Sequence, residues 1–329
     1  MRTVTGDVAP EAIGPTLMHE HVLCDLTQPD RRDEPEVEIT PQNAFEVRYH
    51  WDRHVGNHRL LDRSVAANEL RRFRKAGGRT VVELTSEGIA PDPEGLAAVS
   101  RQADVLVVRG CGTYVAAYAG EALTAASVDA LAERMVRAIR DEGAGIIGEI
   151  GLSDPPHPAE RRALQAAAIA SRETGAAVNV HPPRDAAGVF EAVDLFVDTG
   201  GDPERLVLSH MDRTFAGADE PSRLADRGVV VEWDFFGIND AHYPYAAIDL
   251  PHDGGRLDII RTMIDRGHLT RVALSQDICT KSRLTRWGGH GYAHLLTNVV
   301  PMMRRRSFAE EEIDALLVAT PRRLLAIDP

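Results

Sequence analysis

Cysteine and aromatic residues are scarce in this sequence. Its 329 residues include three cysteines, and Phe, Trp and Tyr together make up 5%. Cys24, Cys111 and Cys279 are far apart and form no CxxC pair, so the sequence predicts neither a disulfide framework nor a cysteine-based zinc site. This cysteine usage is typical of a reducing compartment, and we expect a cytoplasmic protein.

Long apolar runs and an excess of positive charge are missing as well. No hydrophobic stretch approaches the ~20 residues that a membrane-spanning helix needs. Residues 1–14 have neither the charged start nor the apolar centre of a signal peptide. The chain has 37 Lys and Arg against 50 Asp and Glu, a net charge of −13. Because an acidic chain repels phosphate backbones and anionic lipids, we expect no nucleic-acid partner and no membrane partner.

The sequence does contain a regular alternation of two kinds of segment. Short runs rich in β-branched residues alternate with longer segments rich in Ala, Arg and Leu. Predicted strands cover 16–23, 79–85, 104–111, 145–150, 176–181, 205–210, 228–234 and 271–277. Predicted helices cover 64–76, 93–101, 127–141, 158–173, 185–198, 221–226, 255–266 and 291–304. Eight strands that alternate with eight helices are the elements of an α/β fold of the closed (β/α)₈ TIM barrel type. We therefore assign residues 1–329 to a single barrel domain.

An open doubly wound sheet is the alternative fold. Such a sheet usually carries a glycine-rich phosphate loop after its first strand, and the sequence HEHVLCDL has none. The polar segment 27–62 is long for a connection within a barrel, so we interpret it as an excursion at the catalytic face. The segment 308–327 predicts a helix, a turn at Pro321 and a last short helix.

Three histidines of the excursion recur at every fourth residue. This spacing would place His50, His54 and His58 on one face of a helix. A second metal site is one interpretation, but a solvated helix face is the favoured one.

Polar residues mark the carboxyl ends of five predicted strands. They are His19 and His21 on the first strand, Glu149 on the fourth, His181 on the fifth, His210 on the sixth and Asp277 on the eighth. Residues i and i+2 of a strand face the same side, so the first two histidines should point together. Barrel enzymes place their catalytic groups at these strand ends.

Four imidazoles and two carboxylates suit Zn²⁺ or a similar divalent ion. Each residue alone has a simpler explanation, such as a buried, hydrogen-bonded histidine or a carboxylate that caps a loop. The metal interpretation therefore depends on the joint pattern. Because six ligands exceed the needs of one tetrahedral zinc ion, the sequence predicts two ions that share a carboxylate bridge.

The motifs GPTLMHEHVLCDL, GEIG, VNVHP, LSHMDRT, LSQD and GGHGY follow one another along essentially the whole chain. They resemble those of the phosphotriesterase-related proteins of the amidohydrolase superfamily. The resemblance implies that His19, His21 and Asp277 bind the more buried metal, and that His181 and His210 bind the more exposed one. Phosphotriesterases and lactonases carry a carboxylated lysine at the position of Glu149. In this respect the sequence resembles the phosphotriesterase homology proteins, in which a glutamate bridges the metals. Members of the family often pair, so a homodimer is one expected state.

The expected activity is that of a binuclear metal-dependent hydrolase. A hydroxide that bridges two divalent ions, with Zn²⁺ favoured and Mn²⁺ as an alternative, would attack a carbonyl group. Asp277 would accept its proton as the catalytic acid–base residue. The expected small-molecule substrate is a lactone, an ester or an amide. A phosphotriester hydrolase of the aryldialkylphosphatase kind and a metal-binding protein without turnover are the alternatives.

Loops after the strands supply the candidate substrate contacts. Several are basic, which favours a substrate with an anionic group such as carboxylate, sulfonate or phosphate. The aromatic residues among them would line an apolar side of the pocket. The candidates are Tyr114, Arg184, Asp212, Arg213, Phe235, Phe236, Lys281, Arg283 and His290.

Overall fold

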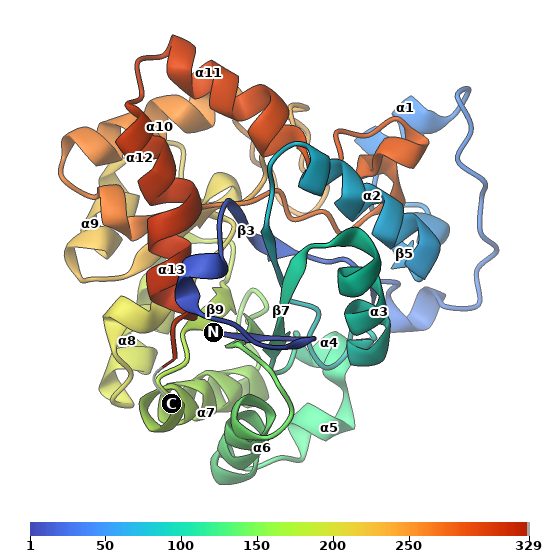
Figure 1. Cartoon of the computed structure of the whole chain (residues 1–329). Helices are drawn as coiled ribbons and strands as arrows, with labels where there is room; N and C mark the ends of the chain where they lie inside the picture. Colours follow the sequence, from blue (N-terminus) through green and yellow to red (C-terminus); the bar gives the residue numbers. More distant parts are fainter. Residues whose placement is uncertain (328–329) are drawn as a thin grey trace.

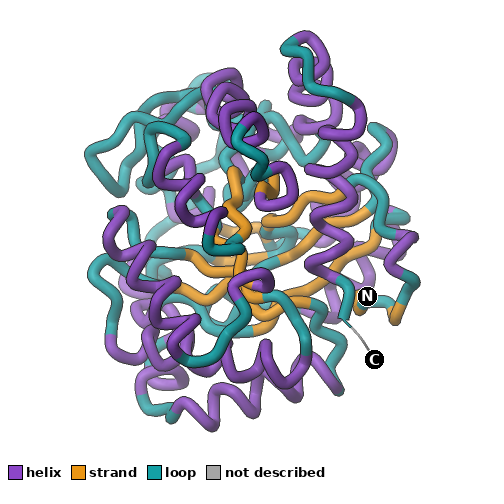
Figure 2. The backbone as a smooth tube through the Cα atoms, turned by 90° about the vertical axis from the view of Figure 1, so that its left-hand side faces the viewer, coloured by secondary structure: helices purple, strands orange, loops and turns teal. Residues whose placement is uncertain are grey.

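Eight parallel strands form the centre of the protein in a computed structural model that describes residues 1–327. The strands are β3 (Thr16–Glu20), β6 (Thr80–Glu83), β7 (Leu106–Cys111), β8 (Ile146–Gly151), β9 (Val178–His181), β10 (Leu206–Leu208), β11 (Val230–Trp233) and β12 (Val272–Leu274). They pair in the order in which they occur along the chain, from β3 to β12. The strands lie in the interior with helices around them (Figure 2).

The first and last strands of this sheet are joined largely through one side chain. Glu20, at the end of β3, accepts hydrogen bonds from Ser275 Oγ at 2.8 Å and from the backbone N–H groups of Gln276 and Ile278, each at 2.9 Å. The backbone N–H of Asp277 also donates to the carbonyl oxygen of His19 at 3.1 Å. These bonds close the sheet, and the predicted (β/α)₈ barrel is confirmed.

The helices that follow the strands form the outer layer (Figure 1). They are α1 (Ala44–Tyr49), α2 (Arg63–Lys75), α3 (Pro93–Ala103), α4 (Ala116–Ala119), α5 (Glu121–Thr124), α6 (Val128–Arg140), α7 (Pro158–Thr174), α8 (Ala186–Asp198), α9 (Asp219–Asp226), α10 (Asp253–Asp265), α11 (Val300–Arg305), α12 (Glu310–Asp314) and α13 (Thr320–Leu325). Several begin at a side chain that accepts hydrogen bonds from the first turn, as Asp62 does for α2. Within residues 1–327, no helix combines the length and the apolarity needed to cross a bilayer.

The barrel strands are buried on both faces, which explains their nearly continuous apolar sequences. Leu17 of β3 belongs to the layer between strands and helices, whereas the next residue, Met18, belongs to a second apolar cluster. That cluster also contains Leu324 and Leu325 of α13, so the last helix covers part of it. Its members on the other strands are Val82, Val108, Ile146, Val207, Val230 and Ala273.

The end of the chain differs from its prediction. Residues 310–325 are continuously helical, so the predicted turn at Pro321 is wrong. A wide π-helical segment, Ala315–Ala319, precedes this proline, and another, Leu295–Val299, precedes Pro301. Proline lacks an N–H and its ring clashes with the carbonyl four residues earlier, and the wide turn accommodates both effects.

The excursion after β3 begins and ends in a short antiparallel pair, β4 (Cys24–Asp25) and β5 (Arg59–Leu60). Between them, α1 ends at Tyr49 and a 3₁₀ turn covers Val55–His58. His50 and His54 therefore lie outside any helix, and the prediction that the three histidines share a helical face is wrong. His54 instead lies 2.6 Å from the carboxylate of Glu46.

Candidate metal centre

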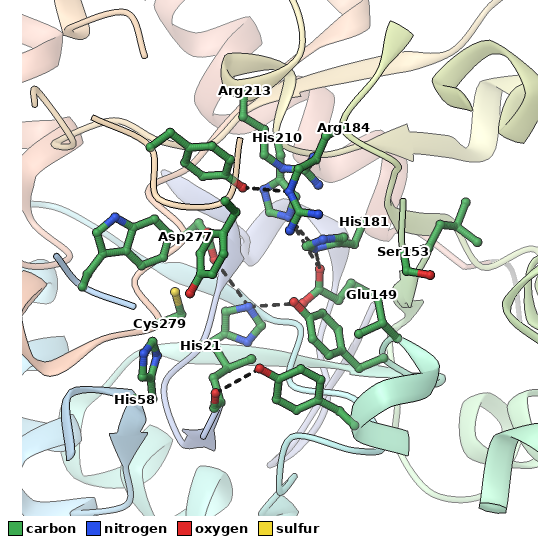
Figure 3. A pocket seen from close by; sticks show the side chains of 18 of the residues that line it. His21, His58, Glu149, Ser153, His181, Arg184, His210, Arg213, Asp277 and Cys279 are labelled. Atoms are coloured by element: carbon green, nitrogen blue, oxygen red, sulfur yellow. Dashed lines mark hydrogen bonds and ion pairs between the residues drawn. The ribbon is translucent and has the colours of Figure 1, made fainter. Parts of the chain in front are cut away.

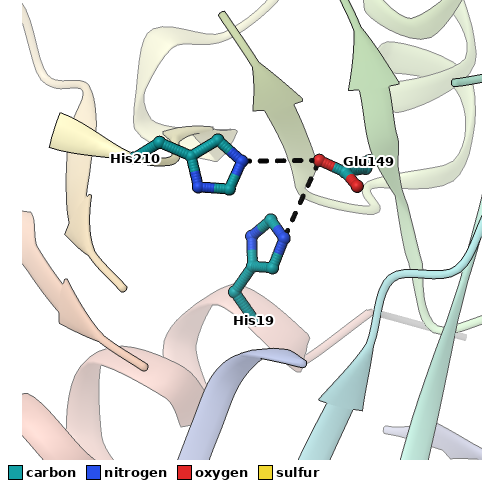
Figure 4. Close-up of side chains that lie close together, drawn as sticks. All are labelled: His19, Glu149 and His210. Carbon is teal, nitrogen blue, oxygen red and sulfur yellow. Dashed lines mark ion pairs between the residues drawn. The ribbon is translucent and has the colours of Figure 1, made fainter. Parts of the chain in front are cut away.

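The six predicted metal ligands lie together at the carboxyl ends of the strands, although they are distant in sequence. Figure 4 shows Glu149 facing His19 and His210. Its Oε1 lies 3.4 Å from His21 Nε2, and its Oε2 lies 3.2 Å from His181 Nδ1 and 3.7 Å from both His19 Nε2 and His210 Nε2. The two oxygens of one carboxylate therefore face different groups of histidines.

Asp277 contacts His19 and His21, the two histidines of the first strand segment. Its Oδ1 is 3.5 Å from His21 Nε2 and 3.9 Å from His19 Nε2. His181 Nδ1 and His210 Nε2 are 3.0 Å apart. Among the six predicted ligands, two sets are compact enough to hold a metal ion: His19, His21 and Asp277, and His19, Glu149 and His210. His19 also forms a third such set with Glu232 and Asp234, behind the predicted ligands.

Two of these residues adopt a backbone conformation that is rare outside glycine. His210 has φ of 59° and Asp277 has φ of 45°. Both lie beyond the ends of their strands, β10 and β12, which are shorter than predicted. The left-handed conformation costs roughly 1–3 kcal/mol and is typically found where a site requires it. It occurs here at two of the residues that meet in the cluster.

Hydroxyl groups orient two of the histidines. His19 Nδ1 lies 3.0 Å from Ser209 Oγ, which is 2.9 Å from the carboxylate of Glu232. His21 Nδ1 lies 3.1 Å from Thr85 Oγ1, which donates to Glu83 at 2.5 Å. The proton of Ser209 has two acceptors at 2.9 Å, Asn179 Oδ1 and Glu232, and that of Thr85 has Glu83. Each hydroxyl oxygen therefore accepts from Nδ1–H of its histidine, and the Nε2 lone pair faces the cluster.

This donor set fits divalent metal ions. His19 Nε2 is buried and has no hydrogen-bond partner among the described residues. A buried nitrogen without a partner is costly unless something else uses its lone pair. Deprotonated imidazole and carboxylate are the ligands that Zn²⁺ and related ions prefer.

The electrostatics of the cluster also favour cations. Burial opposes protonation of His19, but the neighbouring carboxylates, Glu232 foremost, raise its pKa well above the ordinary value. Burial would raise the pKa of Glu149, but its close contacts with His181, His21 and His210 lower the pKa well below its usual range. The negative potential that draws protons to the cluster draws metal cations equally, and metal binding releases such protons.

The other two histidines differ in charge state. Burial and the charge of Arg213 lower the pKa of His181 to about 4 despite its contact with Glu149. Burial likewise lowers the pKa of His210 well below its ordinary value. Both imidazoles are therefore neutral near pH 7, the form that binds metal.

A cavity of about 260 Å³ opens onto the cluster (Figure 3). Four of the predicted substrate contacts line it: Tyr114, Arg184, Arg213 and Phe235. The wall also contains residues that the sequence did not single out for this role, namely Leu26, Trp51, His58, Tyr118, Tyr243, Tyr245 and Cys279. Most of these residues belong to the excursion and to the long connection after β11, and neither segment contains a sequence motif that predicts a site.

Three predicted substrate contacts lie elsewhere. Lys281 is 3.3 Å from the carboxylate of Glu36 and does not line the cavity. Asp212 is buried, where it pairs with Arg256. His290 is half-buried outside the cavity, with its ring against that of His294 at 5.3 Å. Each of these side chains therefore contacts another residue of the protein: Lys281 and Asp212 form ion pairs, and His290 packs against a second imidazole.

The last two candidates lie behind the site. Phe236 is buried in the main hydrophobic core. Arg283 is buried beneath the cluster, where its Nη1 donates to the carbonyl oxygen of Asp277 at 2.5 Å and its guanidinium lies 4.5 Å from the ring of Trp51. Arg283 therefore supports Asp277 and the excursion and does not face the cavity.

Comparison with known proteins agrees with this architecture. The model of the phosphotriesterase family matches residues 1–325. A phosphotriesterase-related protein of Nematostella vectensis is 35% identical, with 98% of this chain and 97% of that protein covered. An N-acetyltaurine hydrolase of Salmo salar is 34% identical, with 99% and 97% covered.

A solved structure shows the same fold. A resiniferatoxin-binding protein from Rhodobacter sphaeroides superimposes with a TM-score of 0.89 at 32% identity, with 99% of this chain and 94% of that chain covered. The resemblance inferred from the six motifs is confirmed: the chain belongs to the phosphotriesterase family.

Proposed function

We propose that the protein is a metal-dependent hydrolase that cleaves the amide bond of a small N-acyl compound with a negatively charged group. The observation that carries the proposal is that four imidazoles and two carboxylates lie close together, largely shielded from solvent, beside a cavity. Membership of the phosphotriesterase family supports metal-dependent hydrolysis. The name of the N-acetyltaurine hydrolases, which this chain resembles along almost its full length, supports an amide with a sulfonate group.

The ligands divide between two ions. His19, His21 and Asp277 would hold one. His181 and His210, whose ring nitrogens lie 3.0 Å apart, would hold the other. Glu149 would bridge them, since its two oxygens face different histidines. Bound divalent ions, with Zn²⁺ expected first and Mn²⁺ as an alternative, would activate water and polarise the carbonyl oxygen of the substrate.

Asp277 is the group best placed to move a proton. Its Oδ1 faces the histidines. Its Oδ2 lies 3.9 Å from Nη1 of Arg283 and is the oxygen that we assign to proton transfer. Burial raises the pKa of this carboxyl group above its ordinary value, which makes it a better proton acceptor. It would take a proton from the attacking water and deliver it to the nitrogen of the leaving amine.

Hydrolysis of a lactone or ester is the second candidate, since it needs the same attack on a carbonyl carbon. Phosphotriester hydrolysis ranks third. The cavity of about 260 Å³ suits a compact substrate, at the lower limit of common ligand pockets.

The test is a comparison of four substrate classes on one preparation of known metal content. The substrates are N-acetyltaurine, N-acetyl amino acids, a γ-lactone and a phosphotriester. We expect the anionic amides to have the highest kcat/KM, with activity lost on chelation and restored by Zn²⁺ or Mn²⁺.

A His268→Gln variant serves as the control and should match the wild-type enzyme, because His268 is half-buried beside Asp226 and does not line the cavity. Full activity in the chelated protein would overturn metal dependence. A preference for the lactone over every amide would overturn the proposed substrate class.

A further inference from the structure

Three arginines of the described chain are buried: Arg213, Arg256 and Arg283, with exposed fractions of 1%, 0% and 4%. Arg256 pairs with two carboxylates, Asp212 and Asp253. Arg283 has a carboxylate oxygen at 3.9 Å. Arg213 differs from both, because no carboxylate oxygen of residues 1–327 lies within 4.0 Å of its guanidinium nitrogens.

The hydrogen bonds of Arg213 are also incomplete. Its Nη2 donates to the carbonyl oxygen of Pro182 at 2.8 Å, while its Nη1 is buried without a partner among the described residues. Burial of an unpaired charge is among the most costly arrangements in a protein interior. Because Arg213 lines the cavity, a partner from outside the chain can reach it there.

A second arginine lines the same part of the cavity. Arg213 is the third residue after His210, and Arg184 is the third residue after His181. Figure 3 shows both arginines on the side of the cavity that carries these two histidines.

Aromatic rings, not carboxylates, hold Arg184 in place. Its Nε donates to the hydroxyl of Tyr243 at 3.5 Å, and its guanidinium lies 5.6 Å from the ring of Tyr245. The guanidinium is half-buried, and its remaining N–H groups are available to a ligand in the cavity.

We infer that Arg213 is the fixed anchor for the negatively charged group of the substrate and that Arg184 is the second donor to it. This inference rests on the proposed function, since it names the group by which that site selects its substrate. A planar guanidinium binds a carboxylate or sulfonate through parallel hydrogen bonds. The anion would lie beside His181 and His210, and the uncharged end of the substrate would face Trp51 and Cys279 across the cavity.

The kinetic test compares N-acetyltaurine with N-propylacetamide, a neutral amide of similar length. In Arg213→Met, we expect the ratio of kcat/KM for the anionic amide to that for the neutral amide to fall about 100-fold. Arg213→Lys keeps the charge but loses the planar fork, and Arg184→Met removes the second donor; in each, the ratio should fall about tenfold. Arg305→Met, at an exposed arginine of α11, is the control and should leave the ratio unchanged.

A binding measurement separates this inference from the proposed function. Propane-1-sulfonate should bind to the metal-loaded wild-type protein in a calorimetric titration, and about 100-fold more weakly to Arg213→Met. If the wild-type protein cleaves no amide but binds the sulfonate through Arg213, the proposed function fails and the anion site stands. If N-acetyltaurine is cleaved and neither the ratio nor the sulfonate affinity changes in the arginine variants, the anion site is overturned.

Discussion

At the scale of single residues, the cluster is defined as much by the groups that orient the ligands as by the ligands themselves. Ser209 and Thr85 fix which nitrogen of His19 and His21 faces the metal positions. The acceptors behind the two hydroxyls, Asn179 and Glu232 for Ser209 and Glu83 for Thr85, direct their protons away from the histidines. The ligands and these orienting groups therefore act as one hydrogen-bonded unit.

Replacement of Asp277 by Asn should separate metal binding from catalysis. An amide of the same shape can still contribute an oxygen ligand, but it cannot accept the proton of the attacking water. We expect kcat to fall at least about 100-fold while most of the metal is retained. Metal analysis and initial rates on the same sample check this, and activity within a few-fold of wild type would refute the role of Asp277.

Replacement of Ser209 by Ala should weaken metal binding without removing a ligand. His19 would lose the acceptor that fixes its ring, and loss of such a group typically costs about 10- to 100-fold in metal affinity. Competition with a chromogenic chelator measures the affinity.

Ser100→Ala is a matched control, because Ser100 is also buried and donates to a backbone oxygen, that of Val105, at 2.7 Å. Its metal affinity should equal that of the wild-type protein. Equal losses in both variants would mean that the effect is general destabilisation.

The sequence pointed to the six residues at the centre of the cluster but not to their supports. The ligands stand at strand ends within recognisable motifs, whereas Ser and Thr are common and acquire a role only when strands distant in sequence become neighbours. Asn179 and Glu232 could have indicated this supporting network, because each is a polar residue inside an otherwise apolar buried strand. Such residues need partners across the barrel, and both bond to Ser209.

At the scale of elements, the barrel strands were predictable and the excursion was not. Alternation of apolar runs and helical segments reflects local sequence, so it located the strands and most helices. The course of residues 27–62 depends instead on contacts made after folding, such as those of Trp51 with Tyr243 and Tyr245, whose ring centroids are 6.1 and 5.2 Å away. The π-helical segments before Pro301 and Pro321 likewise follow from packing that no local pattern reveals.

The excursion should lose stability as the pH falls. Burial, and then the charges of Arg283 and Arg31, lower the pKa of His58 from its ordinary value of 6.5 to about 4. Between these values the unfolded chain binds a proton that the folded chain does not, so stability decreases as pH falls through this window. The loss is about 3 kcal/mol for this group.

A His58→Gln variant should show a smaller loss of stability than the wild-type protein between pH 6.5 and 4. Urea unfolding of both metal-free proteins over this range measures the difference, and the ligand histidines contribute equally to each. Parallel pH profiles would contradict the assigned role of His58.

At the scale of the whole molecule, the predicted metal ligands connect five strands of one closed barrel. They range from residue 19 to residue 277, and the seam at Glu20 joins the same two ends. The closed barrel could be predicted because eight alternating units fit few other folds. Its seam could not, because the side chain of Glu20 and the backbone of residues 276–278 meet only once the other strands are in place.

Removal of metal should therefore lower the stability of the entire fold. A ligand at 100 times its Kd stabilises the folded state by about 2.7 kcal/mol for each site. We expect Tm to fall by several degrees on chelation and to recover with Zn²⁺ but much less with Mg²⁺, which binds imidazole poorly. Differential scanning calorimetry checks this, and an identical Tm with and without chelator would contradict it.

The seam also sets a condition on folding during translation. Its bond between Glu20 and Ile278 spans 258 positions of the chain. At about 5–20 residues per second, a ribosome needs roughly ten to fifty seconds to make that stretch. Throughout this interval β3 has been synthesised but lacks its closing neighbour, so the nascent polypeptide cannot assemble a complete barrel or catalytic centre. The six residues of the cluster can therefore come together only after Asp277 has been synthesised.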